Sequence, residues 1–327
     1  MPQASGLGII GTGSAAPEIQ FHSMSVPQRN AAVSMGQGPV FINKNDAPVY
    51  QTIPRYTLTV WNAVLVCFHA GLAALTLILG NLDLQVEVFK AGIDFRFVDE
   101  AVAGEGRPWE LVPVFIPVAT LAFTWLVASF FILSAFFHLL NCTVLRSYYL
   151  RNLELCYTPT RWIEYFFSAT VMIVIIAYSL GVRDRDTLVS VAALVATTMT
   201  FGYWVEIVGR PKSATEWAAP LTARLLPWVL GHIPQTVAWV LIILRFYDGT
   251  LTDEDRAPAF VHAILWLELV LFFSFGVASL ASQLYPPRLF YRGEIAFQIL
   301  SLVSKGILGI LLIANVLMLS RFEEIYE

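Results

Sequence analysis

The residues of this chain that are able to do chemistry stand in long apolar stretches. Lys305 lies near the middle of one such stretch, and no other lysine occurs inside any of them. A lysine that is desolvated in an apolar pocket loses its proton more readily, and its free amine condenses with an aldehyde to form a Schiff base. Lys305 is therefore the leading candidate for a covalent ligand anchor.

Two other interpretations of Lys305 are a structural ion pair and a side chain that snorkels to the membrane surface. Snorkelling is hard from a central position, since about 15 residues at 1.5 Å each lie on either side. Helical spacing places Gln298, Ser301 and Gly309 on one stripe with Lys305, and the other faces are Leu, Ile and Val. We expect this stripe to face the protein interior.

A protonated Schiff base inside a protein needs an anion beside it. The leading candidate is Glu164, with Ser168 one turn further along the same helical face. Arg161, three residues before Glu164, leaves open a surface ion pair at the membrane interface. If Glu164 is to meet Lys305, its helix must begin before Arg161, with Pro159 in the first turn or at a kink.

Glu206 and Glu268 are weaker candidates for the anion. Glu206 precedes Arg210 by four residues, which suits an interfacial ion pair on a helix. Glu268 stands between two leucines and has no local partner. Charged residues inside a membrane are costly and usually functional, so both remain candidates for an ion path.

Two histidines, His69 and His138, are surrounded by apolar residues in successive stretches. A single buried histidine is more often a hydrogen-bonded core residue, but two on adjacent antiparallel helices raise the prospect of a shared proton-accepting site. His262, Trp266 and Phe273 share one helical face that suits an elongated apolar ligand. The same face is equally ordinary bundle core, and we expect His262, like His232, to be structural.

The elements that carry these residues are seven apolar runs, each long enough to cross a bilayer as a helix. They lack the alternation of barrel strands, so we expect an all-α membrane protein with a seven-helix bundle. The second run exceeds the bilayer thickness, and we expect its Arg146 end to project into water. The runs lie near 56–80, 111–145, 157–182, 187–209, 224–246, 257–284 and 290–319.

The composition agrees with a lipid environment. Hydrophobic residues make up 57% and charged residues 13% of the 327 residues, and the mean hydropathy is +0.66. A soluble domain carries about 25% charge, so most soluble enzyme classes are excluded. The net charge of −4 gives a nucleic-acid partner no electrostatic support. The cysteines Cys67, Cys142 and Cys156 are too few for a disulfide framework.

The distribution of charge predicts the orientation. With the N-terminus inside, the inner segments hold eleven Lys and Arg residues against eight outside. Acidic residues crowd the first and fifth loops, around 83–110 and 253–255. We therefore expect a multi-pass protein with a cytoplasmic N-terminus and an extracellular C-terminus.

Two segments lie outside the predicted spans. Residues 1–52 are expected to be a flexible cytoplasmic tail, and residues 53–327 the seven-helix domain. The tail contains Gly6-Leu7-Gly8-Ile9-Ile10-Gly11, but a dinucleotide fingerprint needs a preceding strand that cannot fit there. Residues 82–88 and 93–97 alternate apolar and polar around a predicted turn at 90–92, which indicates a β-hairpin on the outer surface.

Taken together, residues 53–320 resemble the heliorhodopsins, which are retinal-binding seven-helix proteins of inverted orientation. The motifs that carry the resemblance are Arg161-Trp162-Ile163-Glu164-Tyr165 and Ser301-x-x-x-Lys305. His69, His138, Glu206 and the outer hairpin also fall where that family has comparable features.

The resemblance implies retinal bound as a Schiff base on Lys305, with Glu164 as its counterion. Light would then isomerise all-trans retinal to 13-cis. Ser301 and Ser168 would tune the Schiff base, Trp266 would line the pocket, and His69 with His138 would accept the displaced proton. The resemblance also implies a homodimer formed through the hairpin, and we expect a cytoplasmic signalling partner.

The predicted function is a light sensor, neither an enzyme nor an ion pump, with no catalytic centre and no metal site. Light-driven proton pumps carry a second carboxylate about three turns beyond the counterion, where this chain has Ile175. An apolar residue cannot return a proton. A light-gated proton channel with Glu206 and Glu268 on its path is the first alternative. A transporter or receptor that binds an anion at Lys305 without light is the second.

Overall fold

The fold is that of a computed structural model, which describes residues 49–97, 109–211, 219–249 and 257–319. The chain divides into two units, Met1–Val40 and Phe41–Glu327. The first unit, including the glycine-rich motif at residues 6–11, lies outside the described residues. Residues 49–52, which we predicted to belong to the tail, lie against a short helix. The Gln51 N–H donates to the Glu154 carbonyl at 2.8 Å, and Arg151 donates to the Tyr50 hydroxyl at 3.1 Å.

Seven helices in the described part of the chain are long and apolar enough to cross a membrane, as the sequence predicted. Two shorter helices, α4 (Arg146–Glu154) and η1 (Pro287–Leu289), join neighbouring spans. The long helices are α1 (Arg55–Leu79), α3 (Phe123–Cys142), α5 (Pro159–Ser179), α6 (Arg185–Gly209), α7 (Leu221–Gly249), α8 (Ala259–Leu284) and α9 (Phe290–Asn315).

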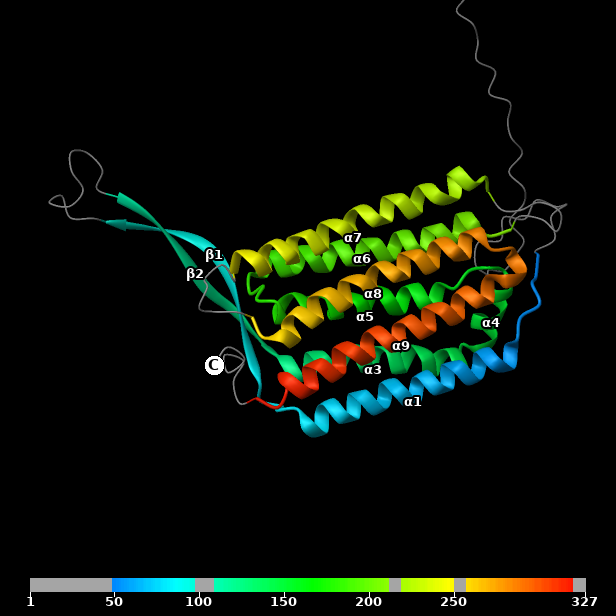
Figure 1. The fold of residues 1–327 in the computed structure, drawn as a ribbon, viewed down its shortest axis with the longest axis horizontal. Helices are drawn as coiled ribbons and strands as arrows, with labels where there is room; N and C mark the ends of the chain where they lie inside the picture. Colours follow the sequence, from blue (N-terminus) through cyan, green and yellow to red (C-terminus); the bar gives the residue numbers. More distant parts are fainter. Residues whose placement is uncertain (1–48, 98–108, 212–218, 250–256, 320–327) are drawn as a thin grey trace, which may run out of the picture. The chain divides into compact units, whose positions relative to one another are not determined.

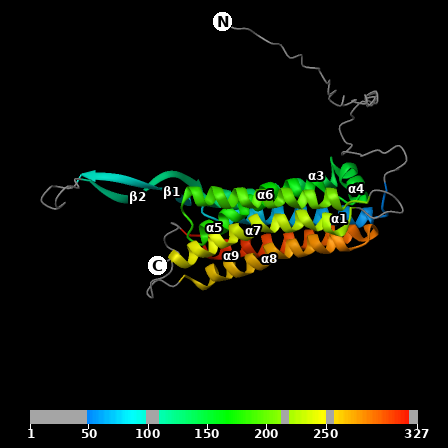
Figure 2. The ribbon, with the colours of Figure 1, turned by 90° about the horizontal axis from the view of Figure 1, so that it is seen from above.

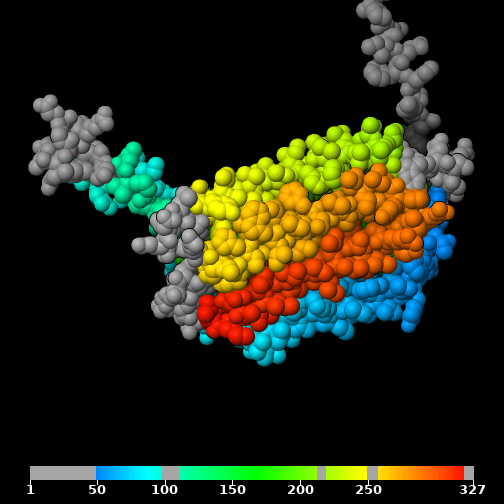
Figure 3. Space-filling model, in the orientation of Figure 1, coloured from blue at the N-terminus to red at the C-terminus, as the bar shows by residue number. Residues whose placement is uncertain are grey.

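These helices pack side by side into a closed bundle (Figures 1 and 2). Along the chain each long helix packs against the next, and α9 closes the bundle by packing on both α8 and α1. Figure 3 shows α7, α8, α9 and α1 in this order across one face. The largest buried shares belong to α5 and α9. The two helices that carry Glu164 and Lys305 are therefore the ones most enclosed by protein.

A two-stranded hairpin lies between the first two spans, as predicted, but its strands differ from those expected. Strand β1 (Gln85–Phe97) runs without a turn at 90–92 and pairs antiparallel with β2 (Trp109–Ala122). The second span therefore begins at Phe123, because the start of its apolar run is a strand. Pro113 and Pro117 disfavour a helix interior there, and the surrounding Val, Ile and Phe residues favour a strand.

At its far end the second span is shorter than the predicted apolar run. Helix α3 ends at Cys142 and the chain turns into α4 at Arg146, whose side chain is exposed. Tyr149, Leu150 and Leu153 of α4 pack with Leu58 and Phe290 into a buried apolar cluster. The short helix thus covers the ends of α1 and α9 at the end of the bundle opposite the hairpin (Figure 1).

The base of the hairpin is joined to the bundle, whereas its outer part exposes apolar side chains. The Phe89 N–H donates to the Arg183 carbonyl at 3.0 Å, and the Tyr178 hydroxyl donates to the Glu87 carbonyl at 2.9 Å. Leu84, Val86 and Val88 are buried against the core. The exposed apolar residues of the outer part are Ile93, Phe95, Phe97, Leu111, Phe115, Ile116 and Val118.

The buried base predicts a stability difference between two neighbouring leucines. Leu84 is completely buried and Leu82 is 43% exposed. Leu84→Ala should lower the free energy of unfolding by about 2–5 kcal/mol, because it leaves a cavity in the core. Leu82→Ala should change it by less than about 0.5 kcal/mol. Unfolding of the detergent-solubilised variants measures both, and equal losses would contradict the packing of the hairpin base.

Candidate functional site

Lys305 lies in the interior of the bundle, about midway along α9, and is 3% exposed. Gln298, Ser301 and Gly309, which share its helical stripe, are also buried. The expectation that this polar and small stripe faces the interior is therefore confirmed. Ser301 lies one turn before Lys305, and Gly309 leaves room for the ring of Phe131, which a side chain at 309 would meet.

The Lys305 amine is held by groups from α3 and α5. Its Nζ donates to Glu164 Oε1 at 2.7 Å and to Ser168 Oγ at 3.1 Å, and it also contacts Ser134 Oγ. All four side chains are buried. Helix α5 begins at Pro159, which occupies its first turn, so Glu164 lies one turn inside the helix. The condition that we set for the contact between Glu164 and Lys305 is met.

Two histidines extend this polar cluster away from Lys305. His138 Nε2 lies 3.8 Å from Glu164 Oε2, and the rings of His138 and His69 stack with centroids 5.7 Å apart. Asn62 Oδ1 lies 2.9 Å from His138 Nδ1, and the amide nitrogen of Asn62 donates to the Leu58 carbonyl. Since Asn62 Oδ1 can only accept, His138 Nδ1 carries hydrogen and Nε2 is left to face Glu164.

The nitrogens of His69 have no hydrogen-bond partner within the described ranges. His69 is fully buried, with the rings of Phe68 and Phe131 beside it. Buried polar atoms without partners are rare in native proteins and call for a specific explanation. The structure therefore brings the two predicted histidines together, and it leaves both ring nitrogens of His69 without a partner among the described residues.

Sequence reasoning missed Asn62 and Ser134. Asn62 precedes His69 by seven residues on α1, and Ser134 precedes His138 by four on α3. Both spacings place a polar residue on the same helical face as a candidate histidine. The signal was thus present, and the same stripe argument that we used for Lys305 would have found both residues.

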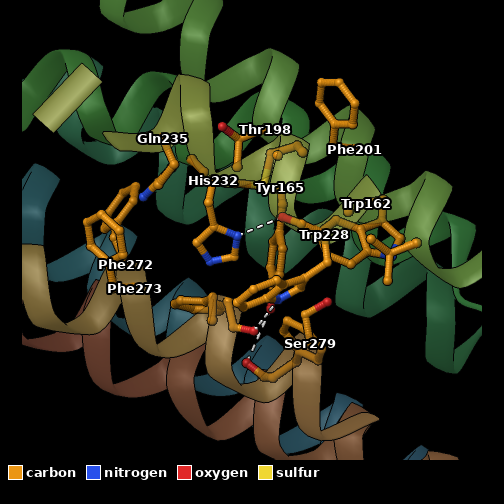
Figure 4. A pocket seen from close by; sticks show the side chains of 18 of the residues that line it. Trp162, Tyr165, Thr198, Phe201, Trp228, His232, Gln235, Phe272, Phe273 and Ser279 are labelled. Atoms are coloured by element: carbon orange, nitrogen blue, oxygen red, sulfur yellow. Dashed lines mark hydrogen bonds between the residues drawn. The ribbon is translucent and has the colours of Figure 1, made fainter. Parts of the chain in front are cut away.

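A cavity lies beside Lys305, between α5, α6, α7 and α8. Lys305, Ser304 and Ser168 form part of its wall, and most of the remaining wall is aromatic or aliphatic. Figure 4 shows Trp162, Tyr165, Trp228, Phe272 and Phe273 around it. This lining is typical of a site for an apolar molecule with few polar anchor points.

One predicted lining residue is placed elsewhere. Trp266 is 47% exposed and does not line the cavity, although Phe273 of the same helix does. The reason is the orientation of α8, which turns Glu268 and Phe272 inward and so turns Trp266 outward. His262 packs on the ring of Phe246, as a structural histidine would. His232, which we also expected to be structural, lines the cavity.

The two remaining glutamates do not lie together. Glu268 is completely buried in α8 and accepts a hydrogen bond of 2.7 Å from Ser304, the neighbour of Lys305. Glu206 lies near the C-terminal end of α6. There it accepts a hydrogen bond from the Thr158 N–H at 2.7 Å and contacts Arg161. The sequence placed both on one possible path, but the structure places them in separate polar groups.

The described part of the structure contains neither of the two ion pairs that the sequence suggested, Arg161 with Glu164 and Glu206 with Arg210. Arg161 does not pair with Glu164, and the partner of Glu206 is Arg161 of α5, although Arg210 follows it by one helical turn. Arg161 forms ion pairs with both Glu206 and Glu294 and lies over the ring of Phe297 at 4.0 Å. These partners come from other helices, which local spacing cannot reveal.

Glu294 was missed, and it belongs to a wider buried network at the α4 end. It accepts from the Tyr149 hydroxyl at 2.9 Å and from Gln298 at 3.2 Å. Glu294 precedes Gln298 by one turn on the Lys305 stripe, so the sequence contained a signal for it. Glu206, Arg161 and Glu294 tie α6, α5 and α9 together on the α4 side of the Lys305 cluster.

This network predicts a large loss of stability when its cation is removed. Arg161→Gln leaves Glu206 and Glu294 buried without their positive partner, and it should lower the free energy of unfolding by about 3–5 kcal/mol. The matched control is Arg185→Gln, which removes an exposed pair with Asp186 and should cost less than about 1 kcal/mol. Thermal or denaturant unfolding in detergent compares them, and equal effects would contradict the network.

Comparison with known protein families identifies the family of the chain. A family model described as Heliorhodopsin matches residues 58–317, which is well over half of the chain. A search of curated proteins finds no match. The matched range contains most of the first span, the other six spans, the hairpin, Lys305 and Glu164. The chain belongs to the heliorhodopsin family of retinal-binding membrane proteins.

Proposed function

We propose that this protein is a light sensor that binds all-trans retinal covalently on Lys305 and does not pump ions. The observation that carries the proposal is the position of the Lys305 amine, which pairs with Glu164 on one side and forms part of the cavity wall on the other. The function rests on that juxtaposition and on membership of the family.

The residues present fit retinal. Its aldehyde end requires an amine, and Lys305 is the one lysine in the described spans. Its chain and ring are elongated and apolar, and the cavity beside Lys305 is lined by aromatic and aliphatic side chains. When bound, retinal supplies the absorption of light and a change of shape from all-trans to 13-cis.

The protein's own residues then hold and move a proton. Glu164 provides the negative charge that keeps the Lys305 nitrogen protonated, and Ser168 and Ser134 orient that nitrogen by hydrogen bonding. His138 lies 3.8 Å from the other carboxylate oxygen and is the next group able to take a proton. The ring of His69 stacks on that of His138, so two imidazoles of the buried cluster are available to accept the proton.

The absence of a proton donor on α5 supports a sensor over a pump. Ile175 lies eleven residues beyond Glu164, and it is buried among Ile173, Ile176 and other apolar residues of the core. Because isoleucine has no titratable group, the residue at this position cannot return a proton to Lys305. A displaced proton would then return by the way it left, which gives no net transport.

A light-gated proton channel is the alternative that a specific observation favours. Glu268 is buried and bonded to Ser304, directly beside Lys305, and it lies on the side away from His138. A carboxyl group there could extend a proton path through the bundle. Lys305 as an anion site is less well supported, because Glu164 already supplies its negative partner.

We further propose an integral membrane protein with a cytoplasmic N-terminus, on the strength of the basic residues in the sequence. The exposed apolar side chains of the outer hairpin support a homodimer, because Phe115 is 73% and Phe95 is 66% exposed in the single chain. A partner chain that covers them would remove this apolar surface from water.

Addition of all-trans retinal to the expressed protein tests the proposal. We expect a visible absorption band in the unaltered chain and none in Lys305→Ala, since the amine that forms the covalent bond is gone. No band in the unaltered chain, or a band that persists in Lys305→Ala, would contradict the proposal.

The counterion role of Glu164 predicts a spectral shift. Glu164→Gln removes the negative charge 2.7 Å from the Lys305 nitrogen, and the band should move strongly to longer wavelength. Glu154→Gln is the matched control, because Glu154 pairs with Arg55 at the bundle end and should leave the band in place. An unshifted spectrum of Glu164→Gln would remove Glu164 from the role.

Electrical recording separates the sensor from the channel. In patch clamp of expressing cells, a sensor gives no light-evoked current at any proton gradient. A current that reverses with the proton gradient and disappears in Glu268→Gln would overturn the sensor in favour of the channel.

A further inference from the structure

The wall of the cavity contains a polar side chain, Gln235, to which the proposed function assigns no role. Gln235 of α7 is 4% exposed and lines the cavity, and its Oε1 has no hydrogen-bond partner within the described part of the chain. Buried polar groups in native proteins are nearly always paired, because an unpaired one has lost its water without compensation. Gln235 therefore calls for a polar group on the molecule that fills the cavity.

His232 stands beside Gln235 on the same wall. The two residues are three apart on α7 and so share one helical face (Figure 4). His232 Nδ1 lies 2.8 Å from the Trp228 carbonyl, which can only accept, so Nδ1 carries hydrogen and Nε2 of the neutral ring is an acceptor. Nε2 packs on Gly276, where any Cβ would collide with it.

Several other polar groups on the cavity wall are satisfied within the protein, although Trp162 Nε1 has no hydrogen-bond partner among the described residues. Thr198 Oγ1 donates to the Leu194 carbonyl at 3.0 Å, and Trp228 Nε1 donates to the Gly276 carbonyl at 2.9 Å. The Tyr165 hydroxyl donates to the Phe297 carbonyl at 3.2 Å. Gln235 differs from the paired groups because its carboxamide oxygen has no donor, and it differs from Trp162 Nε1 because it is an acceptor and Trp162 Nε1 is a donor.

Gln235 and Lys305 belong to different walls of the cavity. Helix α7 packs on α6 and α8, whereas α9 packs on α1 and α8. The partners that hold the Lys305 amine come from α3 and α5. A molecule anchored at Lys305 that fills the cavity therefore presents its far end to α7.

We propose that the cavity prefers a retinal whose ring carries a hydroxyl group, and that Gln235 and His232 recognise that hydroxyl. This inference rests on the proposed function, since it assumes that Lys305 anchors the aldehyde end. A hydroxyl both donates and accepts, so it can donate to His232 Nε2 or Gln235 Oε1 while it accepts from the Gln235 amide. The ring of unsubstituted retinal is hydrocarbon and leaves Gln235 unpaired.

The test is a titration of the full chain, expressed without chromophore, with all-trans retinal, 3-hydroxyretinal and 4-hydroxyretinal. Formation of the visible band gives the apparent affinity for each aldehyde. We expect at least one hydroxylated aldehyde to bind about 10-fold more tightly than retinal, which is the effect of one well-made hydrogen bond. Gln235→Met should abolish this preference. Thr197→Val should keep it, because Thr197 is exposed on α6 and bonded to its own helix.

The outcomes separate this inference from the proposed function. Equal affinities of the unaltered chain for all three aldehydes would overturn the inference and leave the light sensor intact. A preference that survives in Gln235→Met would also overturn it, because the hydroxyl would then be recognised elsewhere. No band with any aldehyde would overturn both. If Gln235→Met fails to fold, the comparison of the three aldehydes on the unaltered chain decides.

Discussion

The ion pair between Lys305 and Glu164 is the interaction on which the rest of the structure depends. Both groups are buried at the centre of the bundle, and an ion pair there is tolerable only when its geometry and additional hydrogen bonds offset desolvation. Ser134 and Ser168 supply those bonds, and His138 lies near the second carboxylate oxygen. The two helices that carry these charges, α5 and α9, have the largest buried shares of the seven described spans.

This constraint divides the interior into parts with different chemistry. The polar cluster occupies the space between α1, α3, α5 and α9, and the apolar cavity lies on the opposite side of Lys305. A second charged network around Arg161 lies toward α4 and joins three helices through Glu206 and Glu294. The lysine thus lies at the boundary between the polar cluster and the apolar cavity, which is the arrangement that the proposed covalent binding of retinal requires.

The sequence predicted those features that local periodicity determines, and it did not predict contacts between residues that are far apart in the chain. Lys305, Glu164 and the Pro159 start of α5 follow from helical spacing and from the rules for proline. The partners of Arg161 are 45 and 133 residues away, so no local pattern could identify them. Residues 111–122 continue the apolar run of the second span, but Pro113 and Pro117 disfavour a helix there and pairing with β1 makes the segment a strand. Trp266 was misplaced because α8 is apolar on nearly every face, which leaves its rotation undetermined by pattern.

The most direct test of the central claim is to locate the covalent bond itself. The retinal-loaded protein is treated with borohydride, which reduces the imine to a stable amine, and the digested peptides are examined by mass spectrometry. The chain has four lysines, Lys44, Lys90, Lys212 and Lys305. We predict that the retinyl adduct is found on the peptide that contains Lys305 and that it is lost in Lys305→Ala. An adduct on Lys44, Lys90 or Lys212, or none at all from a protein that shows the visible band, would contradict the account.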